Sequence, residues 1–156
     1  MDRRRSTGYW AFLADPRHYR ITEALDDLRK TPGEGSSLLK WTTKGKPVRR
    51  GDRALIWKGK GRDAWCGVVA FAEVMGAPQR QSNVDDPYWL DPHSGLVVEE
   101  RVPLRLVFPP HLPLRADESS TASQLSVARA RGGTVFYIQR DEWTRLVDEA
   151  GGWPVE

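Results

Sequence analysis

The chain has 156 residues, of which 39% are hydrophobic and 29% are charged, and its formal net charge at pH 7 is +3. This length suits one domain with one core, and no apolar run approaches the roughly 18 to 20 residues that cross a bilayer, so a transmembrane protein is not expected. One cysteine and three widely separated histidines offer neither a disulfide framework nor a zinc-ligand pattern. We expect one cytoplasmic domain over residues 1–156, without metal or cofactor, in which residues 1–7 form a disordered tail.

The first half of the chain predicts a strand, a helix and a hairpin. The apolar, aromatic run at residues 8–14 predicts a strand that ends at Asp15, because the residue before a proline is disfavoured in a helix. Apolar residues at helical spacing predict a helix from Ile21 to Leu28, which residues 31–33 (Thr-Pro-Gly) stop. Two further apolar runs, at residues 53–58 and 63–75, predict strands joined by a Gly-rich turn.

The second half begins with a polar excursion at residues 78–95, in which Trp89 is expected to anchor neighbouring structure. Strand character resumes over residues 96–107, a weak helical pattern lies within residues 119–129, and residues 134–138 predict another strand. A closing helix at residues 141–150 ends at Gly151-Gly152. This order predicts an α+β fold in which a curled, mainly antiparallel sheet or small barrel is flanked by helices.

Positive charge is concentrated between residues 40 and 62. This segment carries nine Lys or Arg side chains against a single Asp52, so the rest of the chain is net acidic. Trp41 and Trp57 lie within the run, and flat rings among cations are typical of a surface that binds nucleic acid. The alternative is a solvated basic hairpin. The cations expected to contact the nucleic-acid backbone are Lys40, Lys44, Lys46, Arg49, Arg50, Lys58, Lys60 and Arg62.

Common catalytic motifs do not occur in the sequence. There is no Gly-x-Ser-x-Gly elbow and no dinucleotide fingerprint, and neither Gly-Lys step at residues 45–46 and 59–60 is followed by the Ser or Thr of a phosphate-binding loop. We therefore expect a binding module rather than an enzyme.

Several segments together resemble the EVE domain, a PUA-like family related to the YTH readers of methylated adenine. The resemblance is carried by residues 9–21 (Tyr-Trp-Ala-Phe-Leu-Ala-Asp-Pro-Arg-His-Tyr-Arg-Ile), Trp41, Gly51-Asp52, residues 56–58 and residues 67–74 (Gly-Val-Val-Ala-Phe-Ala-Glu-Val). It continues through residues 88–92 and 101–105, and so covers essentially the whole chain. The resemblance implies a PUA-like pseudobarrel with a pocket for a flipped, often modified base. It also implies a separately encoded nuclease or helicase as a partner.

Together with the chemistry of the side chains, the same resemblance suggests which residues bind the base. They are Trp41, Asp15, Thr42, Trp57 and Arg101. Trp41 precedes a polar loop at the position of a cage wall in YTH readers, so we expect its ring to be partly exposed in a concavity with Asp15. The Asp15 carboxylate can accept from the amine of cytosine or adenine, or simply order a turn. Thr42 would offer its hydroxyl, and Trp57 faces either the core or the pocket. Arg101 replaces a second cage tryptophan and would stack through its guanidinium.

The predicted function is recognition of a flipped, modified base, such as methylated cytosine or adenine, in DNA or RNA. Two alternatives remain open. One is an RNA-binding PUA-like module that ignores base modification. The other is a small-molecule enzyme whose acid or base would be Asp15 or Glu73.

Overall fold

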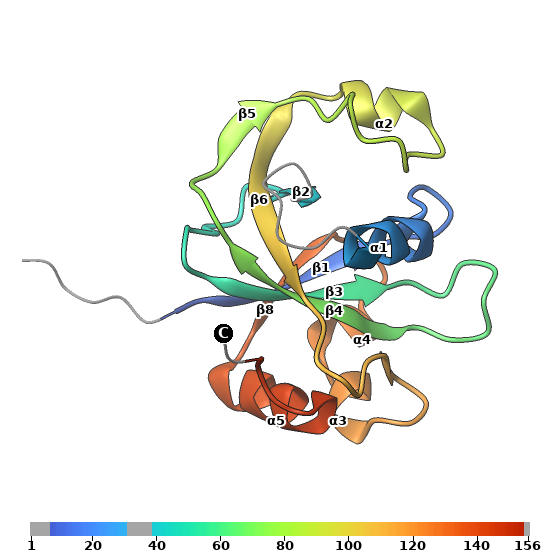
Figure 1. Ribbon diagram of the computed structural model, residues 1–156, viewed down its shortest axis with the longest axis vertical. Coiled ribbons are helices and arrows are strands. Elements are labelled where there is room, and N and C mark those ends of the chain that lie inside the picture. The colour runs from blue at the N-terminus through green and yellow to red at the C-terminus, as the bar shows by residue number, and fades with distance from the viewer. Residues whose placement is uncertain (1–6, 31–38, 155–156) are drawn as a thin grey trace, which may run out of the picture.

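One curled sheet forms the centre of the computed structural model, which describes residues 7–30 and 39–154 (Figure 1). The strands are β1 (Tyr9–Ala14), β2 (Leu39–Thr42), β3 (Arg53–Lys58), β4 (Gly67–Val74), β5 (Gln79–Gln81), β6 (Glu99–Val107), β7 (Leu114–Arg115) and β8 (Val135–Ile138). Their order is β2-β6-β4-β3-β1-β8, with β5 paired to β6 and β7 paired to β4. All pairs are antiparallel except β1 with β3. The predicted mainly antiparallel sheet is therefore confirmed.

Helices cover the sheet on both sides. Figure 1 shows α3 (Ser120–Ser123), α4 (Ser126–Arg129) and α5 (Arg140–Ala150) together on one side, and α1 (Ile21–Lys30) and α2 (Pro92–Leu96) on the other. Helix α5 begins with a capping box between Gln139 and Glu142 and ends at Gly151, whose φ of 104° is left-handed. The predicted helix at residues 141–150 is thus confirmed with its stop.

Side chains alternate between two clusters because successive strand residues point to opposite faces. We call them the α1-side cluster, which contains Phe12 of β1 and Ile56 of β3, and the α5-side cluster, which contains Leu55 and Trp57 of β3. Helix α5 contributes Trp143 and Leu146 to the second cluster. Both faces of the central strands are therefore buried, which explains their continuous apolar runs.

Two predicted strands start later than expected. Strand β4 begins at Gly67, where an added Cβ would lie 2.2 Å from the Leu114 carbonyl oxygen, so only glycine lets β7 approach. Strand β6 begins at Glu99, because Asp91 and Pro92 start α2 instead: the Asp91 side chain accepts a hydrogen bond from the backbone N–H of His93 at 3.0 Å.

Four short elements were not predicted: β2, β5, β7 and α2. The weak pattern at residues 119–129 forms two four-residue helices, α3 and α4. The expected tail lies almost entirely, and the helix stop at residues 31–33 entirely, outside the described residues. Within residues 7–30 and 39–154, no helix is long and apolar enough to cross a bilayer, and no cluster of His, Cys, Asp or Glu is arranged to hold a metal ion.

Candidate functional site

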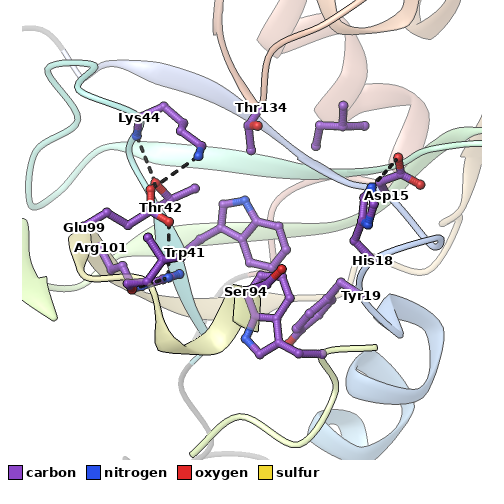
Figure 2. Close-up of a pocket in the computed structure, with 13 residues that line it drawn as sticks. Asp15, His18, Tyr19, Trp41, Thr42, Lys44, Ser94, Glu99, Arg101 and Thr134 are labelled. Atoms are coloured by element: carbon purple, nitrogen blue, oxygen red, sulfur yellow. Dashed lines mark hydrogen bonds and ion pairs between the residues drawn. The ribbon is translucent and has the colours of Figure 1, made fainter. Parts of the chain in front are cut away.

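A cavity of about 280 Å³ lies at one end of the sheet, beyond the end of β1 and beside β2 and the start of β6. Antiparallel pairing of β2 with β6 sets Thr42 opposite Arg101, so both residues reach the same edge. Figure 2 shows Asp15 and His18 on one side of this cavity and Thr42, Glu99 and Arg101 on the other. The lining residues are Leu13, Asp15, His18, Tyr19, Trp41, Thr42, Lys44, Trp89, Ser94, Val97, Glu99, Arg101 and Thr134.

Three aromatic rings form the floor. Trp41 stacks on Trp89, with ring centroids 6.1 Å apart and planes at 19°, and Tyr19 meets both rings edge-on, at 5.1 Å and 4.8 Å. Trp41 does line a concavity with Asp15, but the expected partial exposure of its ring is wrong: Trp41 is only 3% exposed. The physical reason is that the segment preceding β6 folds back and places Trp89 against it.

Polar atoms on this floor are left without partners. The indole nitrogens of Trp41 and Trp89 are buried with no hydrogen-bond partner among the described residues; the same holds for the hydroxyl of Thr43, which does not line the cavity. Figure 2 shows the nitrogen edge of the Trp41 ring directed toward Lys44 and Thr134. A buried donor without an acceptor costs about 1–3 kcal/mol, so an incoming acceptor at this edge would be favoured.

Glu99 organises the side of the cavity opposite Asp15. Its Oε1 accepts from the Thr42 hydroxyl at 2.6 Å and lies 3.4 Å from Lys44 Nζ, while its Oε2 lies 3.2 Å from the Arg101 guanidinium. Arg101 also donates to the backbone carbonyls of Gln81 and Val97, each at 3.2 Å. Thr42 and Arg101 therefore both line the cavity, but their polar groups are engaged within the protein. Arg101 is 1% exposed, which leaves no open guanidinium face for the expected stacking.

Asp15 is held by its neighbour Arg17. The carboxylate accepts from the Arg17 backbone N–H at 2.9 Å and from the guanidinium at 2.8–3.2 Å. These hydrogen bonds lower the pKa of Asp15 below its ordinary value, outweighing the opposite effect of burial. Asp15 is thus a charged acceptor at neutral pH, and His18 Nε2 lies 3.9 Å from it.

Tyr19 is a neutral part of the floor. Its hydroxyl donates to Asp86 at 2.7 Å, and burial, reinforced by the Asp86 charge, raises the pKa of Tyr19 well above its ordinary range. The hydroxyl is engaged with Asp86, so Tyr19 offers its ring edge to the cavity.

The predicted backbone-binding cations do not form one surface. Lys44 lies at the cavity rim and Lys46 in the adjoining hollow, whereas Lys60 lines a different hollow. Lys40, Arg50 and Arg62 are exposed and Arg49 is half-buried. Lys58 is a correction: it is 1% exposed, with Nζ 2.9 Å from Asp63 and 3.0 Å from the Trp65 carbonyl oxygen, so it is unavailable to a phosphate.

Trp57 is a second correction. Position 57 shares a face of β3 with Leu55, and the ring is buried in the α5-side cluster, so it does not line the cavity. The lining residues that sequence analysis missed include Tyr19, Glu99 and Thr134. Tyr19 lies within residues 9–21, which carry part of the family resemblance, but no sequence signal marked Glu99 or Thr134.

No protein-family model and no curated protein sequence matches this chain. Solved structures do. A hypothetical protein from Leishmania major gives a TM-score of 0.63 at 14% sequence identity, over 93% of this chain and 95% of that chain. A protein from Agrobacterium tumefaciens gives 0.59 at 15% identity, over 96% of this chain and 100% of that chain.

A third similar structure is that of the human THYN1 protein in complex with DNA containing 5-methylcytosine. Its TM-score is 0.58 at 11% identity, over 95% of this chain and 100% of that chain. At such identities the likeness establishes the fold alone. The chain has the α+β, PUA-like pseudobarrel fold that the sequence predicts.

Proposed function

We propose that this protein binds nucleic acid and recognises one flipped, modified base in the cavity floored by Trp41. The observation that carries the proposal is the buried Trp41 indole nitrogen, at the wall of a cavity with an aromatic floor, for which residues 7–30 and 39–154 supply no hydrogen-bond partner. The cavity, at about 280 Å³, lies just below the usual range of ligand pockets, which run from about 300 to 1,000 Å³. That size suits a single heterocycle.

Methylated cytosine in DNA is the first candidate. Cytosine presents an amino donor on its pairing edge, which the charged Asp15 carboxylate can accept. Its ring nitrogen and carbonyl are acceptors, which suit the Trp41 N–H and the Lys44 ammonium group, and a 5-methyl group suits apolar Leu13 or Val97 at the wall. The fold shared with a protein that was solved with 5-methylcytosine DNA supports this choice.

Binding is favoured over catalysis for two reasons. A carboxylate with a lowered pKa is a weak general base at neutral pH, which argues against Asp15 as a catalytic group. Glu73 does not line the cavity and is paired with Arg105 at 2.7 Å. A nuclease or helicase as partner stays a prediction from the resemblance.

The test is binding of seven-nucleotide single strands that carry 5-methylcytosine, N6-methyladenine or the unmodified base, as DNA and as RNA, measured by fluorescence anisotropy. We expect preference for one modified base. Trp41→Phe, which keeps a ring but removes the N–H, should weaken that complex by about 2- to 10-fold. Trp65→Phe, outside the cavity, is the matched control.

Equal affinity for modified and unmodified strands would favour the modification-independent RNA-binding alternative. Chemical conversion of the strand during incubation would favour the enzyme alternative. A Trp41→Phe variant that binds and discriminates like the wild type would remove the pocket from the proposal.

A further inference from the structure

Two hollows lie beside the cavity and share lining residues with it. One, of about 640 Å³, is lined by residues 132–137 with Lys44 and Lys46, and we call it the Tyr137 hollow. The other, of about 530 Å³, is lined by Arg17, Lys60 and Arg131, and we call it the Arg131 hollow. The cavity shares two lining residues with each: Lys44 and Thr134 with the first, and Leu13 and Asp15 with the second.

The ridge between the hollows carries little side-chain bulk. Gly132 and Gly133 line both hollows, and beside them Thr134 borders the cavity. Gly133 has a φ of 98°, which favours glycine, and nothing lies within 4 Å of a Cβ built on Gly132. A bound chain can therefore cross this ridge close to the protein backbone.

Unpaired cations lie in both hollows. Within residues 7–30 and 39–154, no ion pair involves Lys46 of the Tyr137 hollow or Lys60 and Arg131 of the Arg131 hollow. The carboxylates there are already engaged: Asp15 with Arg17, and Glu142 with the backbone N–H of Gln139. The positive charge on each side of the cavity is thus available to an anionic ligand.

The Tyr137 hollow also offers an open aromatic ring. Tyr137 is 61% exposed and is the only Phe, Tyr or Trp in the described part of the chain that is largely exposed. The ring meets Trp10 edge-on, with centroids 5.8 Å apart and planes at 80°, and the Trp10 indole is fixed by a hydrogen bond to Asp52 at 2.9 Å. Tyr137 is therefore positioned to stack a flat ring without further ordering.

We propose that the two hollows hold the nucleotides on either side of the recognised base, and that Tyr137 stacks one neighbouring base. This inference rests on the proposed function and makes the preferred ligand a single strand at least three nucleotides long. One flanking phosphate lies against Lys46 and the other against Lys60 and Arg131. Tyr137 then adds affinity for any neighbouring base, while the cavity selects the central one.

The test compares 5-methyl-2′-deoxycytidine with a single-stranded DNA heptamer carrying the same base at its centre, and with a heptamer whose neighbouring positions are abasic. Tyr137→Ala should weaken binding of the full heptamer by about 5- to 100-fold and leave nucleoside binding unchanged. The abasic heptamer should bind the wild type more weakly and show no further loss in Tyr137→Ala. Tyr137→Phe, which keeps the ring, should behave as wild type.

Two variants that each remove one positive charge test the Arg131 hollow. Arg131→Gln should weaken heptamer binding and reduce its salt dependence, whereas Arg80→Gln on β5, which lines none of the three depressions, should do neither.

Failure of the inference and failure of the proposed function give different results. If the nucleoside binds in a Trp41-dependent manner but the heptamer binds no more tightly, the hollows are not used and the pocket stands. If Tyr137→Ala weakens the full and abasic heptamers equally, the ring does not stack a base. If neither ligand binds, this inference is overturned together with the choice of 5-methylcytosine in DNA as the recognised base.

Discussion

The two aromatic clusters of this protein lie on opposite faces of one sheet, yet they differ in how completely their polar atoms are satisfied. On the α5 side, Phe71 of β4, Trp143 of α5 and Trp153 pack together with centroids 5.1–6.3 Å apart. On the α1 side, Trp41 and Trp89 pack as closely, but neither indole nitrogen has a hydrogen-bond partner in the part of the chain that the structure describes. Similar ring packing thus makes a closed core on one face and the wall of a cavity on the other.

The largest expected effect is on the free energy of unfolding, which should distinguish a tryptophan of the α5-side cluster from one at the cavity wall. Trp143→Ala should lower the free energy of unfolding by about 3–5 kcal/mol, because it opens a void in a closed core. Trp41→Phe should cost far less, since the lost packing is offset by removal of an unpaired N–H. Urea denaturation measures both. Equal losses in the two variants would mean that the Trp41 nitrogen is satisfied in solution and that the two clusters are alike.

The second prediction concerns the acceptor at the cavity. Asp15→Asn should weaken binding of an amino-bearing base by about 1.5–3 kcal/mol, the range for a hydrogen bond to a charged group. Asp117→Asn is a matched control, because Asp117 forms a similar pair with Arg115, at 3.0 and 3.2 Å, outside the cavity. Titration calorimetry on the two variants gives the comparison, and equal losses would exclude a direct contact by Asp15.

The pH dependence of binding follows from the ion pair between Asp15 and Arg17. Because the hydrogen bond from Arg17 lowers the pKa of Asp15 below its ordinary value, the carboxylate stays charged throughout the neutral and mildly acidic range. The contribution of the Asp15 carboxylate to binding is present above the ordinary pKa of an aspartate. It is lost as the pH falls through the lowered pKa of Asp15. We expect the difference in affinity between wild type and Asp15→Asn to stay constant between pH 8 and pH 5. A difference that disappears within that range would contradict this prediction.

The third prediction compares two lysines that look equivalent in the sequence. Lys46→Gln should reduce the slope of log affinity against log salt by about 0.7–0.9 and leave stability unchanged. Lys58→Gln should leave the slope unchanged and lower the free energy of unfolding by about 1–3 kcal/mol, because it removes a buried donor from carbonyl oxygens. Salt titrations and urea denaturation separate the two. A lower slope for Lys58→Gln would show that its side chain reaches the ligand.

These comparisons show where sequence information ends. The longer strands and the closing helix were predictable because burial of both sheet faces produces apolar runs. The resemblance, not a strand prediction, placed Trp41 and Asp15 at one site, since β2 was not predicted. Glu99 and Thr134 could not be assigned to the site, because nothing in the sequence distinguishes them from the other residues of the predicted strands that contain them. Lys58 and Lys46 share a basic run, and only the fold determines that one is buried against Trp65.

The smallest expected effect concerns the segment that carries Trp89. The Tyr88 hydroxyl donates to Asp27 of α1 at 2.5 Å at the protein surface, and this hydrogen bond raises the pKa of Tyr88 to about 12. A raised pKa means that the stabilisation is complete below pH 10 and is lost as the pH rises toward 12.

Tyr88→Phe should therefore lower the free energy of unfolding at pH 7 by less than about 1 kcal/mol, because water competes for both groups. The difference from wild type should shrink between pH 10 and pH 12. Urea midpoints at pH 7 and pH 11 measure it, with Tyr137→Phe as control, since the Tyr137 hydroxyl has no hydrogen-bond partner among the described residues. A Tyr88→Phe deficit that is as large at pH 11 as at pH 7 would contradict the prediction, because the hydroxyl would then stabilise the protein independently of its hydrogen bond to Asp27.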